Sequence, residues 1–169
     1  MFFYIIIRLS YYILENSESM NKLIKVSLAG VLSFGISMAA SADDDEIEEA
    51  IEYRQAGMEM IAWNFGRMAA MVKGKMPYEA AEFAKRAENV AALSKMSLEG
   101  YILGSDEGDT DAKAKIWTNW ADFKAKMVEF ENQAVQLADV AKTATTLEEV
   151  KPQFKNTAVC KGCHKKYKK

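Results

Sequence analysis

Both cysteines and the only histidine of the chain lie together near the C-terminus, in the segment Cys160-Lys161-Gly162-Cys163-His164. Two thiols three residues apart can each add to a vinyl group on one edge of a porphyrin, while the next residue presents an imidazole to the iron. This spacing is the attachment motif of c-type haem. The sequence therefore predicts one covalently bound haem c, with Cys160 and Cys163 as thioethers and His164 as the axial iron ligand.

Three other readings of a Cys-x-x-Cys pair need to be weighed. A redox-active dithiol belongs next to a βαβ unit, whereas the pattern of this chain is helical. A zinc site made from Cys160, Cys163 and His164 lacks a fourth soft ligand, and three near neighbours on one helical turn do not easily form a tetrahedron. A structural disulfide in a protein without haem is the third alternative.

The composition is that of one globular domain. The 169 residues are 50% hydrophobic, with Lys+Arg 22, Asp+Glu 24, a formal net charge of -2, nine Gly and two Pro. Disordered and fibrous chains have other compositions. The near-neutral balance also lacks the basic footprint that nucleic-acid binding requires, so no nucleic-acid partner is expected.

The N-terminal part of the chain has the pattern of a targeting sequence. Met20 is followed by two lysines, then by an apolar stretch over residues 26–38, then by the small residues of positions 40–42. This order predicts a signal peptide over residues 20–42 and export to the periplasm, where c-type haem is attached. The rival interpretation, an uncleaved membrane anchor, is disfavoured because the apolar stretch is short and interrupted by Gly, Ser and Lys.

Residues 1–19 precede this signal and have no evident role. We interpret them as a spurious upstream extension, with translation starting at Met20. The predicted mature domain is then 43–169, which holds 19 basic and 22 acidic residues and is mildly acidic.

Helical periodicity dominates the predicted mature domain, and no convincing strand alternation is present. Two long stripes repeat at alternating steps of four and three. The first consists of Ile47, Ile51, Arg54, Met58, Ile61, Phe65, Met68 and Val72, and the second of Ile116, Trp120, Phe123, Met127, Phe130, Ala134, Leu137 and Ala141. A shorter helix between them starts with Pro77 in its first turn and frays near Gly100.

A final helix is expected from about Thr146 to Tyr167. Thr146 and Glu149 have the spacing of a capping box, although Pro152 requires either a kink or a later start near Lys151. Because the connections are short, these helices predict an all-α fold, an antiparallel up-and-down four-helix bundle with a C-terminal covalent haem c.

The order of these features resembles the cytochrome c' family, the class II c-type cytochromes. The resemblance covers essentially the whole mature chain. It is carried by Tyr53-Arg54-Gln55, Phe65-Gly66-Arg67-Met68, Lys73-Gly74, Pro77-Tyr78, Ala80-Ala81, Ile116-Trp117 and the segment from Cys160 to Tyr167. It implies the same bundle and a single haem c.

The sixth coordination position of the iron decides the function. Only five residues follow His164, so a distal ligand has to come from the first three helices. By register with the family, Met58 faces the iron. The resemblance implies a bulky apolar shield and a five-coordinate iron, while low-spin relatives coordinate the iron through a first-helix Met; simple core packing is the third reading of Met58.

Arg54 occupies a seam position where an apolar residue is expected. A buried charge is costly unless it is paired, and a haem propionate would supply the partner. Alternatively, Arg54 extends to solvent at the end of the bundle. The resemblance implies the propionate role and adds Gln55 to it.

The resemblance also implies two weaker contacts. It places the loop containing Ser105 and Asp106 along the haem edge, and Lys168 near the proximal face of the haem; a solvated tail lysine explains Lys168 equally well.

Taken together, the resemblance implies a periplasmic gas-binding and redox protein and not an enzyme. Nitric oxide and carbon monoxide are the implied ligands, with a role in nitric oxide sequestration or tolerance. A low-spin electron carrier with His164 and Met58 both bound is the alternative function. The redox partner is not identified by the sequence, and a homodimer formed through the first two helices is expected.

Overall fold

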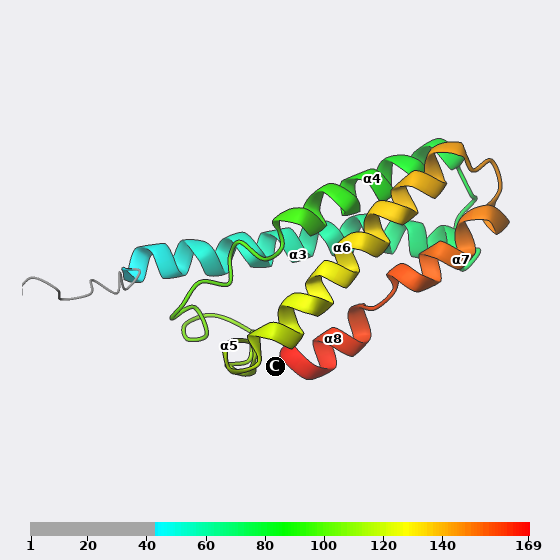
Figure 1. Ribbon diagram of the computed structural model, residues 1–169. Coiled ribbons are helices and arrows are strands. Elements are labelled where there is room, and N and C mark those ends of the chain that lie inside the picture. The colour runs from blue at the N-terminus through cyan, green and yellow to red at the C-terminus, as the bar shows by residue number, and fades with distance from the viewer. Residues whose placement is uncertain (1–42) are drawn as a thin grey trace, which may run out of the picture. The chain divides into compact units, whose positions relative to one another are not determined.

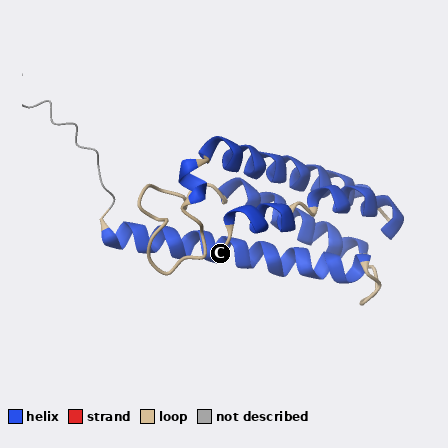
Figure 2. Cartoon of the chain, turned by 90° about the horizontal axis from the view of Figure 1, so that it is seen from below, coloured by secondary structure: helices blue, strands red, loops and turns tan. Residues whose placement is uncertain are grey.

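The computed structural model describes residues 43–169. The predicted signal peptide 20–42 and upstream extension 1–19 lie outside the described residues. The described helices are α3 (Asp44–Val72), α4 (Ala80–Met96), α5 (Lys115–Thr118), α6 (Trp120–Thr143), α7 (Leu147–Thr157) and α8 (Cys160–Tyr167). Within this part of the chain the sole strand-like feature is an isolated bridge between Ala112 and Lys168, which confirms the all-α prediction (Figures 1 and 2).

The four-helix bundle is formed by α3, α4, α6 and the pair α7 and α8. Neighbouring helices run antiparallel, α4 packs against both α3 and α6, and α6 packs against α7 (Figure 1). The main core lies between these helices and contains Met68, Phe83, Val90, Leu137 and Val150, all fully buried. A smaller apolar cluster of Ile116, Phe123, Met127 and Tyr167 joins α5, α6 and α8.

Side-chain caps fix the starts of two helices. The Asp43 carboxylate accepts a hydrogen bond from the Glu46 backbone N–H at 2.9 Å, and the acidic first turn of α3 favours its positive dipole end. Thr146 and Glu149 form the predicted capping box at the start of α7. Hydrogen bonds from the backbone of Thr146 and Thr145 lower the pKa of Glu149, so this stabilisation is present above its usual pKa and fades as the pH falls below it.

Two predicted helix boundaries are wrong. Pro77 precedes α4, which begins at Ala80, so it shapes the connection instead of the first turn. The final helix is interrupted: α7 ends at Thr157 and α8 begins at Cys160. At the break, the Thr157 hydroxyl hydrogen bonds to the carbonyl of Gln133 on α6. Pro152 lies inside α7, which begins at Leu147, so the alternative of a helix start near Lys151 is wrong.

The second predicted stripe is also interrupted, at Asn119. This residue has a non-helical backbone (φ -132°, ψ 42°) and separates α5 from α6. The interruption changes the direction of the next side chain, and Trp120 is 38% exposed instead of lying in the core. The other seven members of that stripe are buried as predicted.

Gly100 allows the segment after α4 to lie against the backbone of α3. A Cβ at this position would come within 2.6 Å of the Ala50 carbonyl oxygen and 2.9 Å of the Arg54 Cβ. We expect Gly100→Ala to lower the free energy of unfolding by about 1–3 kcal/mol, because a backbone carbonyl cannot move aside as a flexible side chain can.

Chemical denaturation of the holoprotein measures this effect. The matched control is Gly57→Ala within α3, where a Cβ would meet nothing within 4 Å. Removing that helical glycine is expected to raise stability by up to about 1 kcal/mol. Equal effects of the two substitutions would contradict the proposed close approach.

None of the helices in residues 43–169 combines the length and the apolar character that a membrane crossing requires.

Candidate haem site

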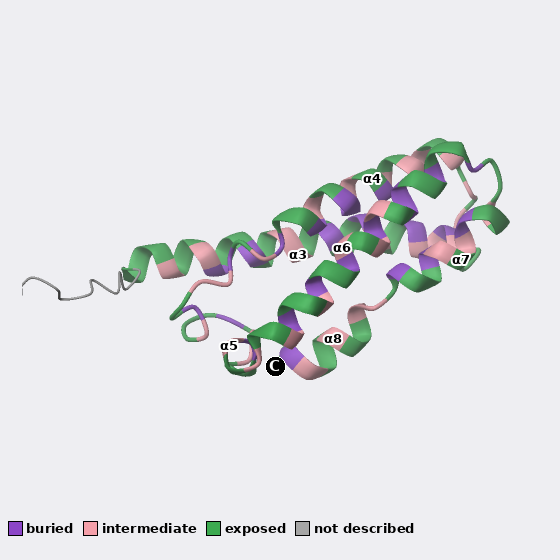
Figure 3. Cartoon of the chain, in the orientation of Figure 1, coloured by how far each residue is buried: buried purple, intermediate pink, exposed green. Residues whose placement is uncertain are grey.

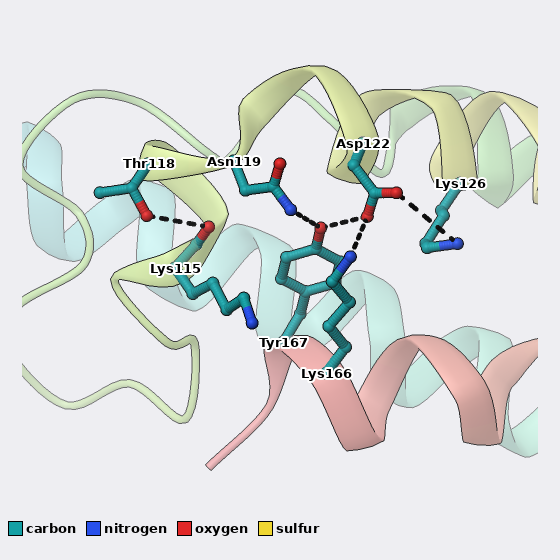
Figure 4. A network of polar contacts seen from close by, with 7 residues as sticks. All are labelled: Lys115, Thr118, Asn119, Asp122, Lys126, Lys166 and Tyr167. Carbon is teal, nitrogen blue, oxygen red and sulfur yellow. Dashed lines mark hydrogen bonds and ion pairs between the residues drawn. The ribbon is translucent and has the colours of Figure 1, made fainter.

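Helix α8 carries the whole attachment motif and is held onto α6 by a polar cluster (Figure 4). The Tyr167 hydroxyl donates to the Asp122 carboxylate, Lys166 Nζ pairs with the same carboxylate at 2.8 Å, and Asn119 donates to the Tyr167 oxygen at 2.9 Å. The hydrogen bond from Lys166, followed by that from Tyr167, lowers the pKa of Asp122. The Tyr167 ring also packs edge-on against Phe123, 5.2 Å between centroids. These contacts fix the end of the helix that presents the motif.

Two cavities meet at the motif. The smaller has a volume of about 360 Å³ and the larger about 640 Å³. Both are lined by Met58, Ala62, Met127, Cys163 and His164. The structure therefore brings together the predicted axial ligand, one predicted thioether cysteine and the predicted distal residue; Cys160 lines the larger cavity only.

The motif side chains are in suitable chemical states. Cys160 and Cys163 are unbridged, so both thiols are free to add to a vinyl group; both are half-buried, and burial raises the pKa of each. Burial, followed by the positive charge of Lys168, lowers the pKa of His164. A lowered pKa favours the neutral imidazole, the form that can bind a metal.

Arg54 is buried, and its guanidinium donates four hydrogen bonds. It donates to the Gly100 carbonyl at 2.9 Å, to the Ser105 hydroxyl at 2.7 Å and to its carbonyl, and to the Thr110 hydroxyl at 2.7 Å. Its charge also lies 5.0 Å from the centre of the Tyr101 ring. The alternative in which Arg54 extends to solvent is wrong, because only 5% of the residue is exposed.

No carboxylate within residues 43–169 pairs with Arg54, although it lines the smaller cavity beside the motif. Burial lowers its pKa, and the opposing effects of Tyr101 and the Asp106 carboxylate do not offset this. A buried cation without an anionic partner next to a cavity is what an acidic group of a bound cofactor would satisfy. The cavities, the thiols, the imidazole and this cation together fit a haem.

The remaining predicted residues are only partly brought together. Gln55 and Lys168 line the smaller cavity. Gln55 donates to the Asp109 carbonyl at 2.8 Å, and Lys168 forms an ion pair of 3.2 Å with Asp111. Ser105 is fully buried behind Arg54.

Asp106 is half-exposed, and neither it nor Ser105 belongs to the lining of the two cavities. Their contact with the haem edge stays a prediction. Sequence reasoning missed Tyr101 and Thr110, which line the smaller cavity and hold Arg54.

The fold and site define a four-helix bundle built around one covalently attached haem c. Comparison with known proteins agrees with this class. The family model described as Cytochrome C' matches residues 49–168. The chain belongs to the cytochrome c' family, and its cofactor is haem c.

Similar proteins cover most of the chain. A curated cytochrome c' from Rubrivivax gelatinosus is 40% identical over 122 residues, which is 71% of this chain and 94% of the relative. The structure of cytochrome c prime from Shewanella frigidimarina is 52% identical, with a TM-score of 0.71, covering 76% of this chain and 99% of that chain. A nitric oxide complex of a cytochrome c prime mutant from Alcaligenes xylosoxidans is 35% identical, with a TM-score of 0.66, covering 73% and 96%.

Proposed function

We propose that this chain is a periplasmic monohaem cytochrome with a five-coordinate iron that binds nitric oxide and carbon monoxide reversibly. Its role would be nitric oxide sequestration or tolerance, with electron-transfer capacity and no enzymatic turnover. The observation that carries the proposal is the position of Met58, an apolar side chain on α3 that lines both cavities together with His164. The solved nitric oxide complex of the relative from Alcaligenes xylosoxidans supports gas binding.

The lining of the larger cavity supports the choice of ligands. Around Met58 it is formed largely by apolar side chains, among them Ile61, Ala62, Phe65 and Phe130. These apolar side chains offer no hydrogen bond to stabilise bound dioxygen, while nitric oxide and carbon monoxide do not need one. The charged residues in the same lining are Lys126 and Glu129. Haem c supplies the gas-binding iron and a one-electron redox couple.

Each motif residue has a role in this proposal. Cys160 and Cys163 form the thioethers, and His164 is the axial ligand. Arg54 and Gln55 hold a propionate. Within residues 43–169 the hydrogen bonds of Arg54 use its two terminal nitrogens, which leaves the Nε–H available for this contact.

Lys168 lies on the proximal side in the proposed complex, and Ser105 and Asp106 lie near the haem edge. Export by the signal peptide 20–42 is part of the proposal and can be checked by the mass of the periplasmic protein.

Absorption spectra of the purified protein test the coordination state. We expect a broad high-spin spectrum for the reduced protein, and a clear shift when carbon monoxide is added, because His164 is the only side-chain ligand. Sharp, split visible bands that do not respond to carbon monoxide would instead assign Met58 or another side chain to the sixth position, and the protein would then be an electron carrier.

The outer face of α3 supports a homodimer, the expected assembly. Trp63 is 65% exposed and Met60 is 50% exposed, and neither lines a cavity. We expect Trp63→Glu to convert the dimer to a monomer in analytical ultracentrifugation, because a charge would be buried in an apolar contact between two copies. Val128→Glu, an equally charged change at an exposed position of α6, is the control and should leave the dimer intact.

A further inference from the structure

Positive charge is concentrated in the C-terminal segment that carries the haem motif. The domain as a whole is mildly acidic, yet residues 158–169 contain five lysines and no acidic residue. In α8, the motif side chains face the two cavities, while Lys161 and Lys165 are exposed. They are four residues apart and therefore share one face of the helix. In Figure 3 most of α8 is coloured as exposed or intermediate.

These two lysines are not neutralised. Lys166 and Lys168 have acidic partners in Asp122 and Asp111. Lys161 and Lys165 form no ion pair with any residue of 43–169. Like charges at this spacing repel each other, so the arrangement is unfavourable for the isolated helix.

The connection between α4 and α6 carries five acidic residues, Glu99, Asp106, Glu107, Asp109 and Asp111, but its last part adds two lysines next to α8. The Lys113 backbone N–H donates to the Tyr167 carbonyl at 3.0 Å, and its ammonium group reaches the Lys165 carbonyl at 3.4 Å. Lys115 follows at the exposed start of α5. We group Lys113, Lys115, Lys161 and Lys165 under the name α8 basic face.

We infer that the α8 basic face is the docking surface for an acidic electron-transfer protein. The inference rests on the redox capacity included in the proposed function. Complementary charge brings an acidic partner to the helix that bears the cofactor, and such steering raises association rates at low salt. A membrane is the less suitable occupant, because surface-bound helices pair basic residues with an exposed apolar face. Within the described residues, α8 has no large exposed apolar side chain.

The test uses the holoprotein and two small oxidants of opposite charge, hexacyanoferrate(III) and tris(phenanthroline)cobalt(III). One electron leaves the reduced protein and converts hexacyanoferrate(III) to hexacyanoferrate(II), with no bond formed or broken. Stopped-flow rates are measured as ionic strength rises. If the basic face attracts the hexacyanoferrate anion, its reaction rate falls as the salt concentration rises, and this is the result that we expect. The acidic net charge of the domain alone would repel the anion and would make the rate rise with salt.

Charge-reversed variants locate the effect. Lys161→Glu combined with Lys165→Glu is expected to slow hexacyanoferrate at low salt about tenfold and to accelerate the cobalt complex. Lys73→Glu with Lys75→Glu is the matched control: both lysines are exposed and lie in the α3–α4 connection, at the end of the bundle remote from α5 (Figure 1). Redox potentials and visible spectra of all variants are compared so that the driving force is known.

A second variant avoids the attachment motif. Lys113→Glu with Lys115→Glu is expected to produce the same signs, and it keeps the test decisive if the α8 variant takes up haem poorly. A hexacyanoferrate rate that rises with salt, or equal slowing by the Lys73 and Lys75 control, would overturn the inference.

Two further measurements separate the neighbouring explanations. Binding of the holoprotein to phosphatidylglycerol vesicles that is lost with Lys161→Glu and Lys165→Glu would assign the face to a membrane and overturn the inference; we expect no such binding. Carbon monoxide binding reports on the proposed gas function separately. Its absence, with the salt dependence intact, would refute the gas function and leave the docking surface supported.

Discussion

Replacing Met58 with Ala is expected to accelerate carbon monoxide binding to the reduced protein by about tenfold, which corresponds to about 1.4 kcal/mol of barrier. The side chain lines both cavities beside His164, so its removal opens space where a gas molecule has to enter. If Met58 is a shield, the resting spectrum of Met58→Ala keeps its high-spin character. Flash photolysis of the carbon monoxide complex measures the rate.

Two further substitutions distinguish a shield from a ligand. Met58→Leu keeps the bulk and removes the sulfur, so a shielding role predicts nearly unchanged gas kinetics and spectrum. A ligand role predicts that a low-spin spectrum disappears in both Met58→Ala and Met58→Leu, with a fall in redox potential. Met60→Ala, half-exposed on the outer face of the same helix, is the control. If Met58→Ala changes neither kinetics nor spectrum, Met58 has no part in the distal site.

The apolar period predicted the long helices but not their interruptions. Phe123, Met127 and Phe130 lie at the predicted spacing and are buried on α6. The break at Asn119 removes only Trp120 from the buried stripe, so the spacing of apolar residues in the sequence hardly reveals this break. At the break before α8, the Thr157 hydroxyl donates to the Gln133 carbonyl, a contact between positions far apart in the sequence.

The haem motif was predictable because all its chemistry is local. Cys160, Cys163 and His164 are separated by fixed short spacings, which do not depend on tertiary structure. Arg54 could also be recognised, since a charge in an apolar seam requires a partner. Its acceptors could not be recognised. Gly100 and Thr110 belong to an irregular connection without periodicity, and only the folded chain brings them to α3.

This position of Arg54 makes Arg54→Leu the substitution with the largest expected effect on stability. The four hydrogen bonds of the guanidinium join α3 to the buried carbonyl of Gly100 and to Ser105 and Thr110. Leu supplies no donor, so the Gly100 and Ser105 carbonyls lose this partner, while the Thr110 hydroxyl keeps its hydrogen bond from the Ala112 N–H. We expect a loss of about 3 kcal/mol in the free energy of unfolding, measured by denaturation of the holoprotein.

The same variant tests the proposed propionate contact. Covalent haem attachment should remain, because Cys160 and Cys163 are untouched. The redox potential should fall, because loss of a nearby positive charge favours the oxidised iron. An unchanged potential at every pH would count against the propionate contact while leaving the structural role intact.

Gln55→Leu and Arg54→Lys separate the two roles of Arg54. Gln55 lines the same cavity but donates only one hydrogen bond to the loop, at Asp109, so its replacement should cost much less stability. Arg54→Lys keeps the positive charge but removes the planar set of N–H donors of the guanidinium. It should therefore preserve the potential better than Arg54→Leu while losing stability, because one ammonium group cannot reach acceptors on three residues at once. Equal stability of Arg54→Lys and the natural protein would show that charge alone holds the loop.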